Sequence, residues 1–482
     1  MCDRQAQAAE IEIRPVPIAV LAIVLLLLLT LAACSEKPHP PVSKAAAGPV
    51  EVDEQRSGNP ERGYEVVVNG SYMSCGLPYR AWRRAAGAPD PGPSLPGRNQ
   101  KNSRLSYSLS VNQDANGVEV VSANCLLCHA ARFDGKLVIG LGNEWLDFTG
   151  DPRALVNAVG GYVSDDAETA AWRKWADRIE AIAPYSMTDT VGVNPAPNIT
   201  LALIAHHDPK TLAWSDEPLL EPPPQKPLPV SVPPWWRIGK KHAMFYNAMG
   251  RGDHARYMMM KSLLCADSVA EAEAIDQQFV DVRAWLASLR PPSYPFPVDR
   301  DLAREGRAVF EKTCSACHGT YGPGASYPNL VVGLDTIGTD PAYALESYAD
   351  SDRFMDWFNR SWYGELASAR PAPGYIAPPL DGVWATAPFL HNGSVPSVAT
   401  LLDSGKRPKY WLRDFDDPQF DARALGWTYR SLSTRKQEIE DPVERKRLYD
   451  TTLPGYSNSG HRFGDGLTDD ERRAVIEYLK TL

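Results

Sequence analysis

The amino-acid sequence predicts a mainly α-helical fold of two domains connected by long proline-rich loops. A Cys-x-x-Cys-His motif occurs twice, at residues 125–129 and 314–318. Amphipathic helical patterns lead into the second motif and lie at the C-terminus. The chain also contains 42 prolines among 482 residues, which predicts long irregular connections. A chain of this length can hold two domains with cores of their own.

Each Cys-x-x-Cys-His motif is typical of the covalent attachment of a c-type haem. The two thiols add to the porphyrin vinyl groups, and the adjacent imidazole becomes the proximal ligand of the iron. The alternatives are half of a zinc site or a dithiol redox pair. A zinc site needs a second cysteine pair nearby, and a redox pair does not explain a histidine in both motifs. The sequence therefore predicts two covalently bound haem c groups, held by Cys125, Cys128 and His129 and by Cys314, Cys317 and His318.

The N-terminal residues 1–33 are predicted to be a bacterial lipoprotein signal peptide. A short apolar run at 18–31 is followed by Leu-Ala-Ala-Cys, which resembles a lipobox and predicts lipidation of Cys34. The alternative is an uncleaved membrane anchor. Either interpretation puts the folded protein outside the cytoplasm, where c-type haem is attached. We therefore expect a periplasm-facing lipoprotein on the outer or the inner membrane.

The rest of the chain divides into three predicted segments. Residues 34–57 are rich in proline, alanine and charge, which predicts a flexible tether. Residues 58–298 are predicted to form the N-terminal haem domain. A helical pattern at 280–289 stops at Arg-Pro-Pro, which indicates the boundary. Residues 299–482 are predicted to form the C-terminal haem domain.

Three further helices are predicted along the chain. Residues 240–264 have apolar side chains at helical spacing, and residues 301–310 form an amphipathic pattern before the second motif. Thr468 and Glu471 form a capping box that begins a last helix. A helix, a haem motif, long loops and a terminal helix are the order of elements in a cytochrome c domain.

Charge and cysteine usage limit the function classes. The net charge of −9 and the pI near 5.6 argue against nucleic-acid binding, which needs a basic surface. Cys75 and Cys265 remain once the signal and haem cysteines are assigned. They are either a disulfide, as expected in an oxidising compartment, or two buried thiols.

The distal ligand of the second haem is predicted to be His461. No methionine follows Met355, and His461 lies shortly before the terminal helix, where a distal ligand belongs. His391 is the rival, and either residue could instead be a hydrogen-bonded loop histidine. Ligation by His461 would make this haem a closed, bis-histidine electron carrier.

The first haem has no distal ligand that spacing singles out. His254 is the best polar candidate and the only acid–base candidate near this site. Methionines at helical spacing are more often core than haem ligands. We therefore expect an open or weakly ligated iron here. The other candidates are His206, His207, His242, Met244, Met249 and Met258 to Met260.

The loop Thr386-Ala-Pro-Phe-Leu-His391-Asn-Gly-Ser394 is similar to a signature of the bacterial di-haem cytochrome c peroxidases. That resemblance implies a Ca²⁺ ion between the domains, bound in part by the carbonyls of Thr386 and Pro388. The chain departs from these peroxidases because it lacks the methionine ligand that follows the loop.

A closer resemblance is to the rubber-oxygenase-like di-haem cytochromes of the same superfamily. It rests on Pro233-Pro-Trp-Trp236, Lys240-Lys241, Pro379-Leu-Asp-Gly-Val-Trp-Ala-Thr386 and Gly460-His461. It implies an oxygen-reactive N-terminal haem and a bis-histidine C-terminal haem. It also implies that Trp236 lies near the first haem and relays electrons between the two haems; the alternative is that Trp235 and Trp236 only fill the seam between the domains.

We therefore expect an exported di-haem oxidoreductase with a periplasmic electron donor or acceptor. Three functions compete: an oxygenase that uses O₂ on a small apolar substrate, a peroxidase that uses H₂O₂ with His254, and a pure electron carrier. The predicted catalytic residues are His254 and Trp236.

Overall fold

The computed structural model describes residues 48–87, 89–349 and 351–482, and these belong to one compact unit. The predicted signal peptide, Cys34 and residues 34–47 of the predicted tether lie outside the described residues. No helix in the described part of the chain has the length and apolar character needed to cross a membrane.

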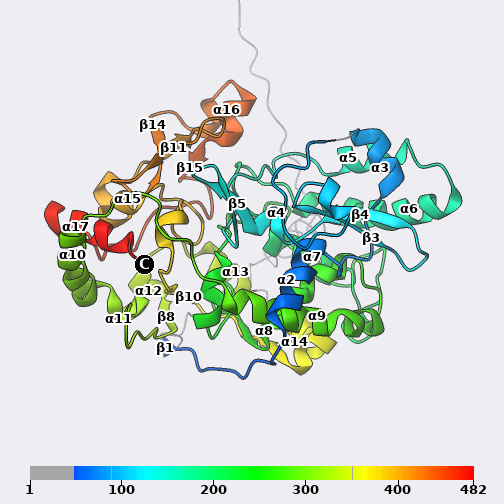
Figure 1. Cartoon of the computed structure of the whole chain (residues 1–482), viewed down its shortest axis with the longest axis horizontal. Helices are drawn as coiled ribbons and strands as arrows, with labels where there is room; N and C mark the ends of the chain where they lie inside the picture. Colours follow the sequence, from blue (N-terminus) through cyan, green and yellow to red (C-terminus); the bar gives the residue numbers. More distant parts are fainter. Residues whose placement is uncertain (1–47, 88, 350) are drawn as a thin grey trace, which may run out of the picture. The chain divides into compact units, whose positions relative to one another are not determined.

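Residues 48–298 contain eight α-helices among the described residues, and Figure 1 shows their arrangement. They are α2 (Pro60–Asn69), α3 (Tyr79–Ala86), α4 (Leu126–His129), α5 (Arg153–Gly160), α6 (Asp166–Ile182), α7 (Ala196–Ala205), α8 (His254–Met258) and α9 (Val269–Ser288). The strands are β1 (Gly48–Pro49), β2 (Leu77–Pro78), β3 (Leu109–Gln113), β4 (Glu119–Ala123), β5 (Ala130–Phe133), β6 (Lys136–Ile139) and β7 (Gly250–Gly252). This part also contains the 3₁₀ helices η4 (Trp235–Lys240) and η5 (Met259–Leu264).

Helix α9 confirms the helix predicted at 280–289 and begins earlier than expected. Ser268 caps its N-terminus by accepting from the Glu271 amide. Gly63 of α2 lies against the Asp281 backbone so closely that a Cβ would collide. A disulfide joins Cys75 to Cys265, with the two Cα atoms 5.2 Å apart.

Residues 299–482 contain α10 (Arg300–Thr313), α11 (Ser315–His318), α12 (Leu334–Ile337), α13 (Ala342–Ala349), α14 (Asp356–Arg360), α15 (Val398–Leu402), α16 (Pro442–Arg447) and α17 (Asp469–Leu479). The strands are β8 (Leu330–Gly333), β9 (Ala367–Ala369), β10 (Gly374–Ile376), β11 (Tyr410–Arg413), β12 (Phe420–Asp421), β13 (Gly426–Trp427), β14 (Tyr429–Leu432) and β15 (Tyr449–Asp450).

Helices α10 and α17 pack side by side, as Figure 1 shows. Both were predicted, and the capping box of Thr468 and Glu471 is present. Gly306 of α10 faces the Ala474 backbone of α17 with no room for a side chain. The rings of Phe310 and Tyr478 meet across the crossing, 5.3 Å apart. This helix pair supports the α10–α11 turn that carries the second haem motif.

The strands form small antiparallel sheets in the orders β1-β8-β10, β14-β11-β15, β12-β13, β2-β4-β3, β5-β6 and β7-β9. Helices account for 40% of the residues and strands for 13%. The prediction of a mainly α-helical fold is therefore only partly supported. Two sheets join distant parts of the chain, because Gly250 pairs with Ala369 and Gly48 with Val331.

The helix predicted over residues 240–264 is largely wrong. Phe245 and Ala248 have positive φ, which α-helical backbone does not allow. The next residues form strand β7, and only the short α8 and the 3₁₀ helix η5 follow. The apolar residues that suggested one helix are buried because the segment crosses the core in several short pieces.

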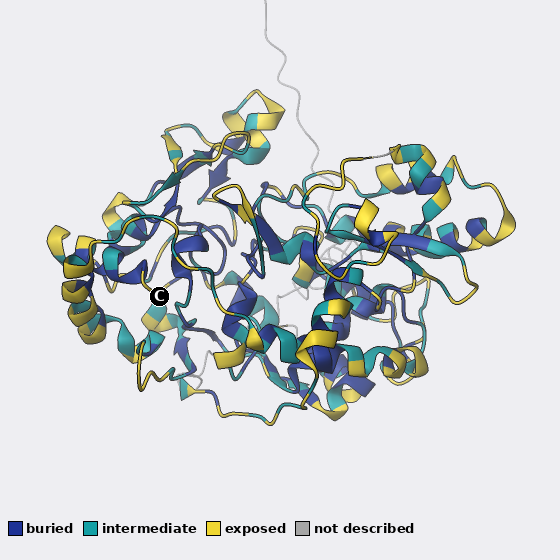
Figure 2. Ribbon diagram, in the orientation of Figure 1, coloured by how far each residue is buried: buried dark blue, intermediate teal, exposed yellow. Residues whose placement is uncertain are grey.

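The buried core, dark blue in Figure 2, is shared by residues from both predicted domains. One apolar cluster contains Phe133 and Trp236 together with Phe310 and Trp384. A larger cluster packs Trp357 and Tyr363 against residues of α6, α7 and α9. The two segments on either side of the predicted boundary at residue 299 thus share their apolar cores.

Candidate haem sites

The second Cys-x-x-Cys-His motif spans the turn from α10 into α11. Cys314 ends α10, and its carbonyl accepts from the His318 amide at 3.1 Å. The His318 Nδ1 atom lies 2.8 Å from the Pro378 carbonyl, which fixes the ring orientation and leaves Nε2 available to a metal. Burial lowers the pKa of His318, so its imidazole is neutral and able to bind iron.

His461 lies opposite His318, with the ring centres 6.2 Å apart. Gly460 and His461 both have positive φ, at 74° and 45°. For a histidine this backbone conformation is uncommon and is typical of functional sites. The His461 amide donates to the Ile337 carbonyl at 2.7 Å, and the Arg407 guanidinium donates to the His461 carbonyl at 3.0 Å. Burial lowers the pKa of His461 to about 4, which keeps the ring neutral.

His391, the rival ligand, lies in an aromatic box. Its ring stacks on Tyr375 at 4.1 Å and lies 6.3 Å from the Tyr343 ring. Its carbonyl accepts from the Ser231 amide at 2.8 Å. Burial lowers its pKa to about 3. Among the ring contacts of the described residues, none joins His391 to His318.

The first motif is carried by the four-residue helix α4, between strands β4 and β5. The Tyr72 hydroxyl accepts from the Cys125 amide at 2.9 Å and lies 2.8 Å from the Cys125 sulfur. His129 stacks on Trp235, with the ring centres 4.6 Å apart. Burial lowers the pKa of His129 to about 3, and the positive charge of Lys261 adds to the shift. This histidine is also neutral and able to bind a metal.

The histidines of the two motifs, His129 and His318, have different surroundings. No second histidine ring contacts His129 in the part of the chain that the structure describes. Met259 and Met260 are buried in the core, as methionines at helical spacing usually are. Half-buried Met258 and Cys125 pack against the same apolar cluster. Lys261 near His129 was not found from the sequence, because nothing in its local pattern marks it.

His254, the predicted acid–base residue, begins α8 and is 1% exposed. Neither of its ring nitrogens has a hydrogen-bond partner among the described residues. Burial lowers its pKa to about 4, and the charges of Arg283 and Lys241 add to this shift. Burial and these positive charges keep the His254 imidazole neutral. The structure contains no ring contact between His254 and His129 among the described residues.

The remaining histidine candidates each meet a backbone carbonyl. The Nδ1 atoms of His206, His207 and His242 lie 2.8, 2.7 and 2.8 Å from the carbonyls of Ser215, Leu203 and Val50. His207 also meets the Ala266 carbonyl through Nε2. Both ring nitrogens of His207 are therefore occupied.

Trp236 lies between the two motifs. Its indole Nε1 donates to the Asp381 carbonyl at 2.8 Å, three residues after Pro378, which meets His318. Its neighbour Trp235 stacks on His129. The adjacent tryptophans thus connect one proximal histidine to the backbone segment that holds the other.

Arg237 is a site residue that sequence reasoning missed. Its side chain is buried, and its Nε donates to the Asp381 carbonyl at 3.2 Å. Its Nη2 has no hydrogen-bond partner among the described residues. The positive charge of Arg237 contributes to the lowered pKa of His318, so the guanidinium lies near the second motif. Only the fold brings the two residues together, because 81 positions separate them in the chain.

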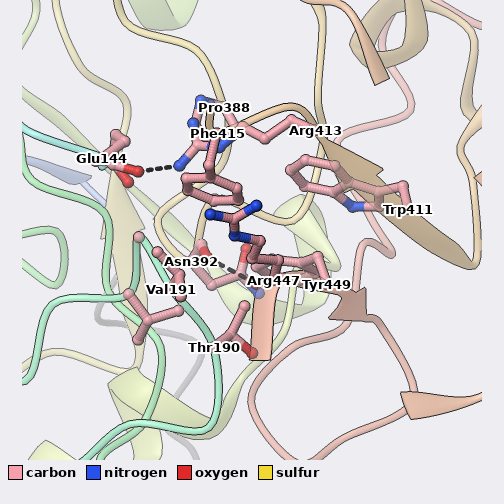
Figure 3. A pocket seen from close by; sticks show the side chains of 13 residues that line it. Glu144, Thr190, Val191, Pro388, Asn392, Trp411, Arg413, Phe415, Arg447 and Tyr449 are labelled. Atoms are coloured by element: carbon pink, nitrogen blue, oxygen red, sulfur yellow. Dashed lines mark hydrogen bonds between the residues drawn. The ribbon is translucent and has the colours of Figure 1, made fainter. Parts of the chain in front are cut away.

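The loop predicted to help bind calcium borders a narrow pocket, shown in Figure 3. Pro388 lines this pocket beside Arg413 and Glu144. The Thr386 hydroxyl donates to the Val383 carbonyl at 3.0 Å. In the described ranges, no group of three or more histidine, cysteine or acidic side chains is arranged to hold a metal ion.

Two protein-family models match parts of the chain. The model described as "RoxA-like, cytochrome c-like" matches residues 374–412, and the model described as "Cytochrome C oxidase, cbb3-type, subunit III" matches residues 301–361. These matches show cytochrome c-like sequence in the C-terminal part of the chain. They imply covalently bound haem c and support a haem-based electron-transfer protein.

Two curated proteins of Sinorhizobium fredii are also similar. The uncharacterized protein y4iJ is 32% identical over 41% of this chain and 42% of its own length. The uncharacterized protein y4iM is 31% identical over 42% of this chain and 53% of its own length. The chain therefore spans about half the length of the curated relatives it matches.

Proposed function

We propose that this cytochrome c-type protein is an exported di-haem oxidoreductase with two unlike haems. The haem held by His129 would have a coordination position open to a small ligand, and the haem held by His318 would transfer electrons. We also propose that the chain belongs to the di-haem cytochrome c peroxidase superfamily, in the rubber-oxygenase-like branch. When bound, the haems supply redox chemistry toward O₂ or H₂O₂, which protein side chains alone do not have.

The observation that carries this proposal is the difference between the two proximal histidines. Two imidazoles on opposite sides of one iron have ring centres about 6 Å apart, because each nitrogen binds a metal at about 2 Å. The separation of 6.2 Å between His318 and His461 fits this arrangement. His129 instead has the Trp235 ring beside it, and no histidine ring opposite it among the described residues. A filled axial position favours electron transfer, and an open one permits ligand binding.

Trp235 and Trp236 are the proposed electron path between the haems. Trp235 contacts His129, and Trp236 donates to the Asp381 carbonyl in the segment that meets His318. Both side chains are buried, which shields the path from solvent. Packing at the seam and electron relay are compatible roles for the same pair.

Arg237 is proposed to hold the second haem. A buried guanidinium with a free Nη2 needs an anionic partner, and the haem propionates are carboxylates. The Tyr321 hydroxyl donates to the His318 carbonyl and accepts from the Leu380 amide, which fixes the same region from the other side. Arg237 would therefore pair with a propionate of the haem beside His318.

Two alternatives remain as candidate functions. A peroxidase is favoured by His254, whose buried and unpaired ring nitrogens suit proton transfer. A pure electron carrier would require both irons to be six-coordinate. The proposed partners are a periplasmic electron donor or acceptor, with O₂ or H₂O₂ and a small apolar substrate at the first haem. Anchoring through Cys34 to the outer or inner membrane is part of the proposal.

The test is a titration of the reduced, purified holoprotein with carbon monoxide, followed by its optical spectrum. A pyridine haemochrome assay on the same sample counts the haems. We expect two haems per chain and one bound carbon monoxide. No carbon monoxide at either haem would leave only the electron carrier, and two would contradict the closed second haem. Addition of H₂O₂ with a reduced dye then separates a peroxidase from an oxygenase.

A further inference from the structure

Arg413 lies in the pocket at the loop where the superfamily resemblance implies a calcium ion. The side chain reaches from strand β11 toward Glu144, as Figure 3 shows. Residues 190–193, Pro388 and Asn392 also line this pocket. We propose that the Arg413 guanidinium takes the place of the divalent cation. This inference rests on the proposed membership of the superfamily, because only that resemblance implies the ion.

A backbone carbonyl and two aromatic rings surround the Arg413 guanidinium. The side chain is buried, its Nη2 donates to the Glu144 backbone carbonyl, and its Nη1 has no hydrogen-bond partner among the described residues. Its central carbon lies 4.3 Å from the Trp145 ring centre and 4.6 Å from that of Phe415, so two aromatic faces hold the charge. A Cβ on Gly192 would lie 2.6 Å from Nη2, so the absence of a side chain there makes room for the arginine.

The same pocket is poorly suited to a divalent cation. Calcium takes 6–8 oxygen ligands, mostly carboxylates and carbonyls. Among the described residues that line the pocket, Glu144 supplies the only carboxylate, and its Oε1 already accepts from the Ser231 hydroxyl and the Val232 amide. Arg413 and Arg447 line the same space, and their charges repel a cation. The Glu144 carbonyl, which could bind a metal, accepts from Arg413 instead.

Arg413 thereby fixes the loop that follows the first haem motif. Asn143, next to Glu144, donates from its amide to the Cys128 carbonyl at 2.8 Å and from its side chain to the Leu127 carbonyl at 3.0 Å. The Glu144 carboxylate holds Ser231 and Val232, which precede the Pro-Trp-Trp segment beside His129. Arg413, a residue of the C-terminal part, thus positions both segments around the first haem motif. Its positive charge belongs to the chain, so it cannot leave the pocket as a bound metal ion can.

The first arm of the test uses the wild-type holoprotein. Calcium is measured by mass spectrometry after gel filtration in metal-free buffer, and the melting temperature is measured with and without the chelator EGTA. We expect substoichiometric calcium and the same melting temperature in both buffers. One calcium per chain, or a lower melting temperature in EGTA, would overturn the inference.

The second arm compares Arg413→Gln with Arg447→Gln, both as holoproteins. Arg447 lines the same pocket but pairs with exposed Asp416 at its rim. We expect a melting temperature several degrees lower for Arg413→Gln and nearly unchanged for Arg447→Gln. Equal melting temperatures for wild type and Arg413→Gln would count against the positioning role. If Arg413→Gln does not fold, the melting temperature is measured on Arg413→Lys instead, which keeps the positive charge but lacks the planar guanidinium. A melting temperature of Arg413→Lys equal to that of the wild type would overturn the positioning role of Arg413.

A failure of the proposed function has a different signature. The haemochrome count and the carbon monoxide titration on the same samples report the haems and not the pocket. Fewer than two haems would refute the di-haem function whatever the calcium result. Stoichiometric calcium with two haems would refute only the assignment of Arg413.

Discussion

Arg237 has one unpartnered nitrogen on a buried guanidinium, and its neighbours near the second haem motif are mostly aromatic. Burial lowers the pKa of Arg237, and the nearby Tyr246, Tyr321 and Asp381 oppose this shift. Asp381 already pairs with Lys240 at 2.7 Å. A positive charge in such a place disfavours the ferric haem and so raises its reduction potential.

We predict that Arg237→Gln lowers the midpoint potential of the haem held by His318. A lost interaction of about 1.4 kcal/mol corresponds to a shift of about 60 mV for one electron. Lys240→Gln is the matched control, because its ammonium is already paired with the Asp381 carboxylate and its side chain is 41% exposed. A redox titration followed in the visible spectrum measures both. An unchanged potential in Arg237→Gln, or an equal shift in the control, would contradict the assignment.

His391 provides a prediction on pH dependence. Burial lowers its pKa to about 3, below the value near 6.5 of the unfolded chain. The unfolded state therefore binds the proton first, and stability is lost as the pH falls below 6.5.

We predict that His391→Gln removes part of this acid sensitivity. The difference in free energy of unfolding between wild type and variant should change by about 2–3 kcal/mol from pH 7.5 to pH 4.5. The wild type loses this stability as the pH falls, because only its folded state keeps His391 unprotonated. Urea unfolding at several pH values measures it, and parallel pH profiles for the two proteins would show that His391 is protonated in the folded state.

At the scale of elements, the crossing of α10 and α17 depends on Gly306. A side chain at this position would meet the Ala474 backbone, which is fixed by its own helix. Gly466, just before α17, has open space around its Cα. The two glycines are therefore a matched pair for substitution.

We predict that Gly306→Ala destabilises the holoprotein by about 1–3 kcal/mol, the usual effect of overpacking a close contact. Gly466→Ala should change the free energy of unfolding by less than about 0.5 kcal/mol. Denaturant unfolding compares the two variants. A neutral Gly306→Ala would mean that the helices can separate without cost.

The elements that could be predicted are those with complete local signals. Each of three such signals is contained in a short stretch of sequence: the capping box before α17, the amphipathic pattern of α10 and the Arg-Pro-Pro end of α9. Residues 240–264 misled prediction because their apolar spacing came from several short buried segments, with positive φ at Phe245 and Ala248. The small sheets were not predicted, because their strands are short and pair over long distances. Gly250, for example, pairs with Ala369.

At the scale of the whole molecule, the candidate site joins residues that local patterns could not connect. The predicted haem attachment residues and proximal histidines are contiguous in each motif, and their roles stay predictions. His461 was singled out from the absence of methionines and its place before the last helix, and its ligand role stays a prediction. Trp235 beside His129, Arg237 near His318 and Arg413 against Glu144 were missed, because 106, 81 and 269 positions separate these pairs. Only the packing of the two parts of the chain brings them together.

The electron paramagnetic resonance spectrum of the oxidised holoprotein tests most directly whether the two proposed haems differ in axial ligation. We predict one low-spin signal from the haem held by His318 and His461, and one high-spin or weakly ligated signal from the haem held by His129. His461→Ala should convert the low-spin signal to high spin and leave the other unchanged, whereas His391→Gln should retain both. Two low-spin signals in the wild type, or a low-spin signal that survives in His461→Ala, would contradict the account.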